Sequence, residues 1–232
     1  MDFNHILDLF YPPKCPFCGK ITQDGICSEC RKAYPFIKEP FCKKCGKPVS
    51  DDQKEFCYDC SHKKHYFCEG RALWIHRGKV SEAVYALKYK NKKIYGEVFG
   101  TEMGRMFSSY LKQKGVSLLI PIPLHKSRFR RRGYNQAEIL ARRISEISGI
   151  PLDTNTLVRV KGTIAQKELD DKQRRRNIRN AFAVVGNICA GKVALIDDIY
   201  TTGSTLDEAA DTLLASGVGK VYFLVISIGQ GF

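Results

Sequence analysis

Short apolar runs alternate with longer amphipathic segments over most of the chain beyond about residue 67. The apolar, β-branched runs lie at 117–122, 192–196 and 220–228. Helical periodicity marks the segments 80–89, 95–113, 136–148 and 204–215. Short strands that are apolar on both faces and separated by helices are typical of a parallel sheet covered on both sides. The pattern therefore predicts an α/β domain.

The first 66 residues have a different character. They are rich in Lys, Pro and Gly, contain eight of the ten cysteines and show little helical or strand periodicity. We therefore predict two parts, a small module at residues 1–66 and an α/β domain at residues 67–232. Residues 2–10 have the apolar spacing of a short amphipathic helix that docks onto the rest.

The eight cysteines of the small module form four Cys-x-x-Cys pairs. A Cys-x-x-Cys turn brings two thiolates to one ion, and two such turns complete a tetrahedral shell. We predict one or two structural Zn²⁺ ions, with the ligands taken in sequential order, although an interleaved pairing remains open. The predicted ligands are Cys15, Cys18, Cys27 and Cys30 for one site and Cys42, Cys45, Cys57 and Cys60 for the other.

Several other residues near this module allow a simpler interpretation. His62 and His65 follow the second group of cysteines, but four thiolates already complete a shell, so we expect both to be solvated loop residues. Cys68 and Cys189 are expected to be small buried apolar residues. Aromatic residues are available to stack on bases, but we favour packing around the metal sites; they are Tyr11, Phe17, Tyr58, Tyr66 and Phe67.

The stretch Asp-Asp-Ile-Tyr-Thr-Thr-Gly-Ser-Thr joins the apolar run at 192–196 to the helix predicted at 204–215. Backbone N–H groups at the start of that helix, together with hydroxyl side chains, form a nest for a phosphate group. Asp197 and Asp198 cannot share the phosphate, so they are suited to sugar hydroxyls or Mg²⁺. The stretch predicts a ribose 5-phosphate site, while an Asp-rich turn that caps a helix is the plainer alternative.

A second polar loop follows the apolar run at 117–122. It contains Arg128, Arg130, Arg131 and Arg132 and leads through a glycine turn to Asn135 and Gln136 at the start of a helix. Arginines beside a helix N-terminus are suited to a pyrophosphate group. A solvated basic loop is an equally good interpretation of these residues taken alone.

The Asp-Asp loop resembles the phosphoribosyl pyrophosphate (PRPP) motif of type I phosphoribosyltransferases. Together with Pro121–Leu124, Arg132–Gln136, a stretch from Gln166 to Phe182 and the four cysteine pairs, it resembles the competence protein F (ComF) family. Leu87-Lys88-Tyr89 matches a helix between the two parts of that family. The resemblance implies a type I phosphoribosyltransferase fold, a parallel sheet flanked by helices, with a small N-terminal zinc-ribbon module in which four cysteines bind each ion.

The resemblance also implies roles for individual residues toward PRPP and Mg²⁺. Asp197 and Asp198 would hold the ribose hydroxyls, and Arg174 and Arg175 on a segment that closes over the substrate would add positive charge. Two loops would bind the phosphate groups: the 5-phosphate on Thr201, Thr202, Gly203, Ser204 and Thr205, and the pyrophosphate on Arg132, Asn135 and Gln136.

Two functions are compatible with this resemblance. One is a PRPP-binding phosphoribosyltransferase with an unknown acceptor, which acts in competence and natural transformation by handling incoming single-stranded DNA. The other is a non-catalytic module that binds DNA or a competence helicase and uses the PRPP pocket as a sensor. Zinc ribbons and arginine-rich loops are compatible with a phosphate backbone in either case.

Composition and charge narrow these possibilities only slightly. The chain of 232 residues is 44% hydrophobic and 27% charged, which excludes a disordered or fibrous protein. Its net charge of +14 favours anionic partners, although a basic surface also promotes solubility. No apolar run approaches the roughly 20 residues that cross a bilayer, and no signal peptide is recognisable. We expect a cytoplasmic protein without membrane insertion.

Overall fold

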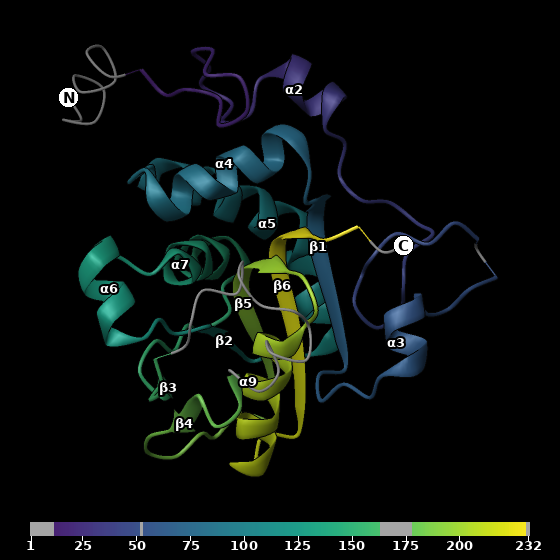
Figure 1. Ribbon diagram of the computed structural model, residues 1–232, viewed down its shortest axis with the longest axis vertical. Coiled ribbons are helices and arrows are strands. Elements are labelled where there is room, and N and C mark those ends of the chain that lie inside the picture. The colour runs from purple at the N-terminus through teal and green to yellow at the C-terminus, as the bar shows by residue number, and fades with distance from the viewer. Residues whose placement is uncertain (1–11, 52, 163–177, 231–232) are drawn as a thin grey trace.

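The computed structural model describes residues 12–51, 53–162 and 178–230 (Figure 1). The helices are α2 (Ser28–Ala33), α3 (Tyr58–His62), α4 (Gly78–Tyr89), α5 (Lys93–Lys114), α6 (Lys126–Arg132), α7 (Gln136–Ser148) and α9 (Ser204–Ala215). The strands are β1 (Glu69–Ile75), β2 (Leu118–Pro121), β3 (Leu157–Arg159), β4 (Phe182–Val184), β5 (Lys192–Tyr200) and β6 (Lys220–Ile228).

Four strands form a parallel sheet in the order β1-β6-β5-β2, and β3 pairs with β4 in a separate antiparallel hairpin. The prediction of a parallel α/β sheet is therefore confirmed. The strand that leads into the phosphate loop is longer than expected, because it runs on to Tyr200 and includes both Asp197 and Asp198.

Helices cover both faces of the sheet, as the apolar strands predicted (Figure 1). Along β6, Tyr222, Leu224 and Ile226 pack with α4, α5 and α7 on one face. The alternating residues Val221 and Phe223 pack with α9 on the other. This alternation follows from the two-residue repeat of a strand and accounts for a run that is apolar throughout.

Three glycines allow α5 and α7 to pack closely. Gly96, Gly100 and Gly104 are four residues apart and so lie on one face of α5. A Cβ atom at these positions would lie 2.8–2.9 Å from side-chain atoms of α7, in Ile139, Arg143 and Ile147 respectively. The close packing of these two helices fixes the N-terminus of α7, which borders the site described below.

The two cysteine-rich ribbons pack on opposite faces of the sheet. Phe17 of the first ribbon belongs to the apolar cluster with α4 and α5, and its ring lies 5.3 Å from that of Trp74. Cys42, Cys45 and Cys57 of the second ribbon belong to the cluster with α9. The ribbons are thus built into the core of the α/β part, and the domain boundary at residue 66 stays a prediction.

Several expectations for single residues need correction. His65 is not a solvated loop residue, because its side chain is 2% exposed and lies 2.6 Å from Asp207. Cys189 is exposed and Cys68 only partly buried. Among the ribbon aromatics, Phe17 and Phe67 are buried, as the packing interpretation expected, whereas two tyrosines are exposed, Tyr58 and Tyr66.

Some expectations lie outside the described residues. These are the helix at residues 2–10 and the aromatic residue Tyr11. Among the helices that the structure describes, none combines the length and the apolar character needed to cross a membrane.

Candidate functional site

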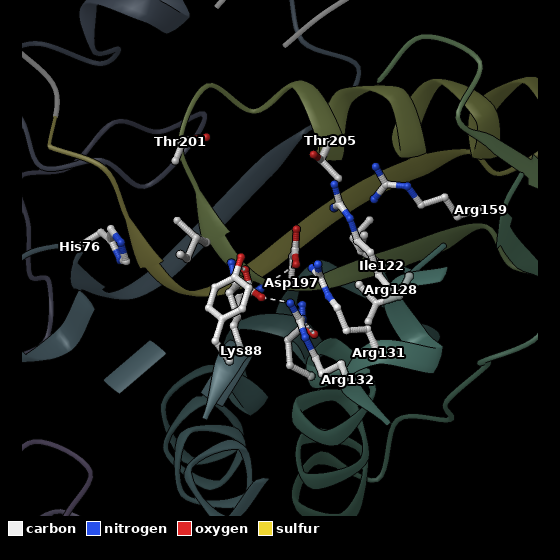
Figure 2. A pocket seen from close by; sticks show the side chains of 15 residues that line it. His76, Lys88, Ile122, Arg128, Arg131, Arg132, Arg159, Asp197, Thr201 and Thr205 are labelled. Carbon is white, nitrogen blue, oxygen red and sulfur yellow. Dashed lines mark hydrogen bonds and ion pairs between the residues drawn. The ribbon is translucent and has the colours of Figure 1, made fainter. Parts of the chain in front are cut away.

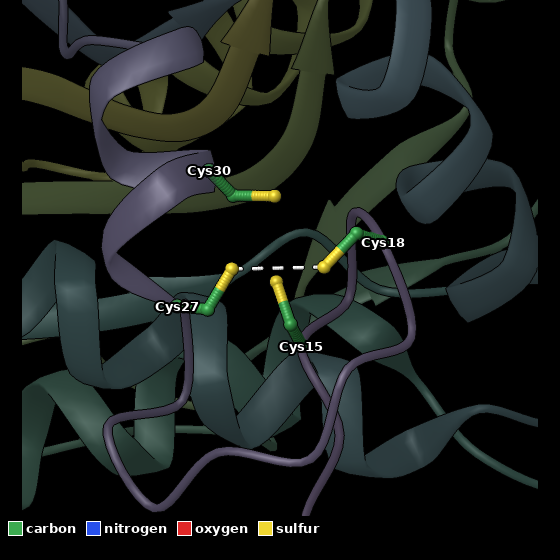
Figure 3. A group of neighbouring side chains, drawn as sticks. All are labelled: Cys15, Cys18, Cys27 and Cys30. Atoms are coloured by element: carbon green, nitrogen blue, oxygen red, sulfur yellow. Dashed lines mark hydrogen bonds between the residues drawn. The ribbon is translucent and has the colours of Figure 1, made fainter.

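The eight cysteines of the ribbons form two clusters. In each cluster the four sulfur atoms lie within 4.8 Å of one another, and the groups are those predicted in sequential order. Figure 3 shows the first cluster, in which the Sγ atoms of Cys18 and Cys27 are 3.6 Å apart. The Sγ atoms of Cys45 and Cys57 in the second are 3.7 Å apart. Tetrahedral zinc with Zn–S bonds of about 2.3 Å places its sulfurs about 3.8 Å apart, so both clusters fit structural Zn²⁺.

A cavity of about 250 Å³ opens at the carboxyl ends of β1, β2 and β5 (Figure 2). In parallel α/β sheets, ligands bind at this edge because loops and helix N-termini converge there. The cavity brings together β5, the phosphate loop, α6 and the end of α4. Its lining residues are His76, Lys88, Tyr89, Ile122, Leu124, Arg128, Arg131, Arg132, Gln136, Arg159, Asp197, Asp198, Ile199, Thr201 and Thr205.

The two adjacent carboxylates in this cavity have different partners. Asp198 Oδ1 lies 2.7 Å from Lys88 Nζ, and Asp198 Oδ2 accepts a hydrogen bond of 2.6 Å from Gln136 Nε2. Asp197 Oδ1 accepts the Asp198 backbone N–H at 2.8 Å. Asp198 is therefore paired with a lysine and an amide, whereas Asp197 is not paired in this way.

Burial, and secondly the negative charge of Asp198, raise the pKa of Asp197 from 3.8 to about 7. The positive charge of Lys88 opposes this shift without cancelling it. A carboxyl group with such a pKa changes its protonation near neutral pH, as groups at ligand sites often do. Binding of a ligand that needs the anion would release a proton from Asp197.

The phosphate loop joins β5 to α9 through Gly203. Gly203 has a φ of 79°, and a Cβ atom there would lie 2.6 Å from the hydroxyl oxygen of Tyr200. Only glycine suits both conditions. The N-cap of α9 is Gly203, and among the described residues no side-chain hydrogen bond caps this helix end, whose first N–H groups face the loop. This arrangement is suited to a phosphate group.

Four arginines line the cavity around Asp197 (Figure 2). Arg128, Arg131 and Arg132 come from α6, and Arg159 comes from the short strand β3. Burial, and secondly repulsion from Arg128, lower the pKa of Arg159 to about 10. Clustering of like charges is costly without an anion, so this cluster is organised to hold negative charge.

The structure brings most of the predicted site residues together. Asp197, Asp198, Arg132, Gln136, Thr201 and Thr205 line the cavity. Asn135 instead caps α7, since its Oδ1 accepts from Ala137 N and its Nδ2 donates to Ile122 O, both at 3.1 Å. Thr202 and Ser204 hydrogen-bond to each other at 2.9 Å and border a second hollow beside His65. Arg174 and Arg175 lie outside the described residues.

Several lining residues were not predicted to belong to the site, among them Lys88, Arg159 and His76. Lys88 was noted only as part of a motif, and nothing in its local sequence indicates that its partner is Asp198. Arg159 lies between two valines in a strand of three residues, where a charged side chain is unexpected and so provides a weak signal. His76 follows β1 directly, and its Nδ1 lies 2.9 Å from the Oγ of the buried Ser227.

Comparison with known proteins agrees with both parts of the structure. A model of the double zinc ribbon domain matches residues 6–61. Competence protein F of Haemophilus influenzae is 30% identical over 228 residues, which cover 91% of this chain and 95% of that protein. The chain belongs to the competence protein F family.

Other proteins are also similar to this chain. Competence protein ComFC of Bacillus subtilis is 29% identical over 84% of this chain and 80% of that protein. DNA utilization protein YhgH of Salmonella typhimurium is 28% identical over 92% of this chain and 96% of that protein. A purine phosphoribosyltransferase from Pyrococcus horikoshii matches 55% of this chain and 70% of its own, with a TM-score of 0.36 and 16% identity. The predicted parallel sheet flanked by helices, with an N-terminal double zinc ribbon, is confirmed.

Proposed function

We propose that the cavity binds PRPP and that the protein acts in competence as a cytoplasmic phosphoribosyltransferase with an acceptor still to be identified. The observation that carries this proposal is the convergence of two carboxylates, the N-terminus of α9 and four arginines on one cavity. PRPP has a matching group for each of them: the hydroxyls of its ribose, a phosphate and a pyrophosphate. The names of the competence relatives support the cellular role.

Each wall of the cavity has one task in this proposal. The N–H groups of α9 and the hydroxyls of Thr201 and Thr205 hold the 5-phosphate. Asp197 accepts from a ribose hydroxyl after losing its proton. Arg131 and Arg132 hold the pyrophosphate. Arg174 and Arg175 stay predicted contributors of positive charge.

Transfer breaks the bond from ribose C1 to a pyrophosphate oxygen and forms a bond from C1 to the acceptor. Negative charge develops on the departing pyrophosphate, and fixed cations already aimed at it stabilise that charge without reorganising. The acceptor loses one proton in the same reaction. The residues of this chain therefore contribute positioning and charge neutralisation rather than a covalent intermediate.

Calorimetric titration of PRPP into the zinc-loaded protein, with Mg²⁺ present, tests the proposal. We expect binding to weaken by at least about tenfold in the variant Asp197→Asn/Asp198→Asn, because each lost charge-assisted hydrogen bond is a large contribution. Asp211→Asn, an exposed acid of α9 outside the cavity, is the matched control. Equal affinity in the double variant, or no binding by the wild type, would contradict the proposal.

A second candidate function, binding of single-stranded DNA, is favoured by one surface beside the cavity. Residues 85–93 and 126–134 contain nine Lys and Arg residues and no acidic residue. The two segments meet where the Arg132 guanidinium lies 5.3 Å from the centre of the Tyr89 ring. Tyr85, Tyr89 and Phe129 are 43%, 48% and 48% exposed. Cations interleaved with exposed rings are typical of surfaces that bind single strands.

Fluorescence anisotropy with a labelled oligothymidine distinguishes this surface from a generally basic one. We expect Tyr85→Ala/Lys90→Ala/Lys92→Ala to weaken binding by at least about tenfold, because stacking on one ring contributes about 1–3 kcal/mol. None of these three residues lines the cavity. Lys112→Ala/Lys220→Ala removes two exposed lysines at the other end of the sheet and should have little effect. Equal losses in both variants would indicate nonspecific attraction.

A further inference from the structure

Positive side chains outnumber negative ones in the lining of the cavity. Among the lining residues that the structure describes, two are acidic, Asp197 and Asp198, and five are cationic: Lys88, Arg128, Arg131, Arg132 and Arg159. An excess of fixed cations in a partly enclosed site attracts an anion of several charges strongly, because the low local dielectric weakens screening. The protein itself thus provides the charge that neutralises a diphosphate.

The described residues of the cavity are not arranged as ligands for Mg²⁺. Magnesium at phosphate sites is bound by one or two carboxylates together with the phosphates of the ligand, so the two carboxylates of this cavity would need free oxygens to hold it. Both oxygens of Asp198 already have partners, Lys88 Nζ at 2.7 Å and Gln136 Nε2 at 2.6 Å. A metal ion at Asp198 would also meet the charge of Lys88 at close range. The groups of three or more metal-ligating side chains in the described residues are the two cysteine clusters.

We propose that this cavity binds the diphosphate of PRPP without Mg²⁺, and that Lys88 provides the charge that a metal ion would otherwise bring. This inference rests on the proposed function and adds which side chain balances the negative charge of the diphosphate. Lys88 is placed for this role because its Nζ lies at the carboxylate pair while its side chain is 20% exposed toward the cavity.

The surroundings of Lys88 allow it to change partners. Tyr134 donates a hydrogen bond to the backbone carbonyl of Leu87, which anchors the end of α4 to the segment between α6 and α7. The four-carbon stem of lysine lets the ammonium group move between neighbouring anions, whereas the flat guanidinium of arginine is more restricted. When Lys88 turns toward a diphosphate, Gln136 still donates to Asp198.

Titrations with PRPP and with inorganic pyrophosphate, each in excess EDTA and in millimolar Mg²⁺, test this inference. Because both clusters hold zinc, the EDTA is added just before titration and the zinc content is measured afterwards. We expect the wild-type affinity for both ligands to change by less than about threefold between the two conditions, because fixed cations replace the metal ion. Wild-type binding that requires Mg²⁺ would overturn this inference and leave the proposed function standing. No binding of PRPP under either condition would overturn the proposed function itself.

Variants of Lys88 give the second part of the test. Lys88→Met should lose about tenfold or more in EDTA, the amount expected for a charged hydrogen bond, and should recover part of it with Mg²⁺. Lys112→Met, which changes an exposed lysine of α5 outside the cavity, should bind like the wild type. Because Lys88→Met leaves Asp198 buried without its cation, thermal unfolding is compared, and Lys88→Arg provides a variant that keeps the charge. Wild-type affinity of a folded Lys88→Met protein in EDTA would overturn the assignment of Lys88.

Discussion

The two cysteine clusters have the same ligands but different surroundings. The first cluster belongs to the apolar core with α4 and α5, and its ribbon is joined to α5 by Arg31, which contacts both oxygens of Glu102 at 2.7 and 2.8 Å. The Glu102 side chain is 5% exposed. None of the residues of this ribbon that the structure describes lines the cavity. The first ribbon therefore serves as an anchor for a helix.

The second cluster lies beside the phosphate loop. The chain that leaves it places His65 Nδ1 at 2.6 Å from Asp207 of α9, and the backbone N–H of Tyr66 donates to the same carboxylate at 3.1 Å. The next residue, Phe67, packs edge-on against Tyr200, with ring centres 6.1 Å apart. Tyr200 in turn supports Gly203. Two clusters with the same cysteine ligands therefore support different parts of the protein, helix α5 in one case and the phosphate loop in the other.

Removing one ligand from each cluster should separate these roles most strongly. We expect Cys18→Ser and Cys57→Ser each to lose about one zinc per chain and at least about 3 kcal/mol of stability, because structural zinc provides folding energy. Only Cys57→Ser should also abolish PRPP binding at a temperature where the protein stays folded. Zinc analysis, thermal unfolding and PRPP titration measure these effects. Equal PRPP affinity in the two variants would remove the distinction.

Breaking the anchor of the first ribbon should destabilise the fold without affecting the ligand site. Glu102→Ala removes the carboxylate that pairs with Arg31, and we expect a loss of about 2–3 kcal/mol, toward the low end for buried pairs because the Arg31 side chain is 35% exposed. Urea unfolding measures the loss, and Glu102→Gln keeps the shape as a control. A fall in PRPP affinity would show that the first ribbon also influences the cavity.

A single added carbon atom at Gly203 should strain the phosphate loop. Gly203→Ala combines a positive φ with a contact to Tyr200, and we expect a loss of about 2 kcal/mol together with most PRPP binding. Gly186→Ala is the matched control, because its φ of 78° is similar and no atom lies within 4 Å of the added carbon. That variant should lose only about 1 kcal/mol and keep its affinity. Identical behaviour of the two would mean that Tyr200 does not restrict the loop.

The smallest effect is expected at the contact between the second ribbon and α9. His65→Ala removes the hydrogen bond to Asp207, so we expect a loss of about 1 kcal/mol and a fall of about threefold in PRPP affinity. His65→Asn, whose amide can donate to the same carboxylate, should restore part of both. His62→Ala changes the neighbouring exposed histidine and should change neither. If His65→Ala binds PRPP normally, the ribbon supports the loop through Phe67 and the backbone N–H of Tyr66.

The elements with local signals were predictable. The helix predicted at 136–148 has the same bounds as α7, because Asn135 caps its start and Gly149 ends it in the left-handed region. The strand at 220–228 has the same bounds as β6 because it is buried on both faces. By contrast, β1 was missed, since Glu69, Gly70 and Arg71 interrupt its apolar pattern and its place in the sheet depends on pairing with β6.

The site could be predicted only in part, because some of its residues, like β1, depend on contacts between distant parts of the sequence. Asp197, Asp198 and Thr205 are neighbours in sequence, so one motif identified them together. Lys88 reaches Asp198 from a helix more than a hundred residues earlier, and Arg159 reaches the cavity from a separate hairpin. Such contacts depend on the packing of α4 and β3 against the sheet, which no local pattern encodes. The different states of the two carboxylates follow from these distant partners.

The order of the strands has a consequence for synthesis of the chain. The first strand, β1, pairs only with β6, the last, among the strands that the structure describes. All eight cysteines of the ribbons precede β1, so both metal clusters can assemble while the ribosome is still making the sheet. An unpaired strand edge is prone to aggregation until its partner arrives. The nascent chain therefore has all its cluster cysteines before the first strand and completes its sheet last, and deleting residues of β6 would expose the edge of β1, at the opposite end of the sheet sequence.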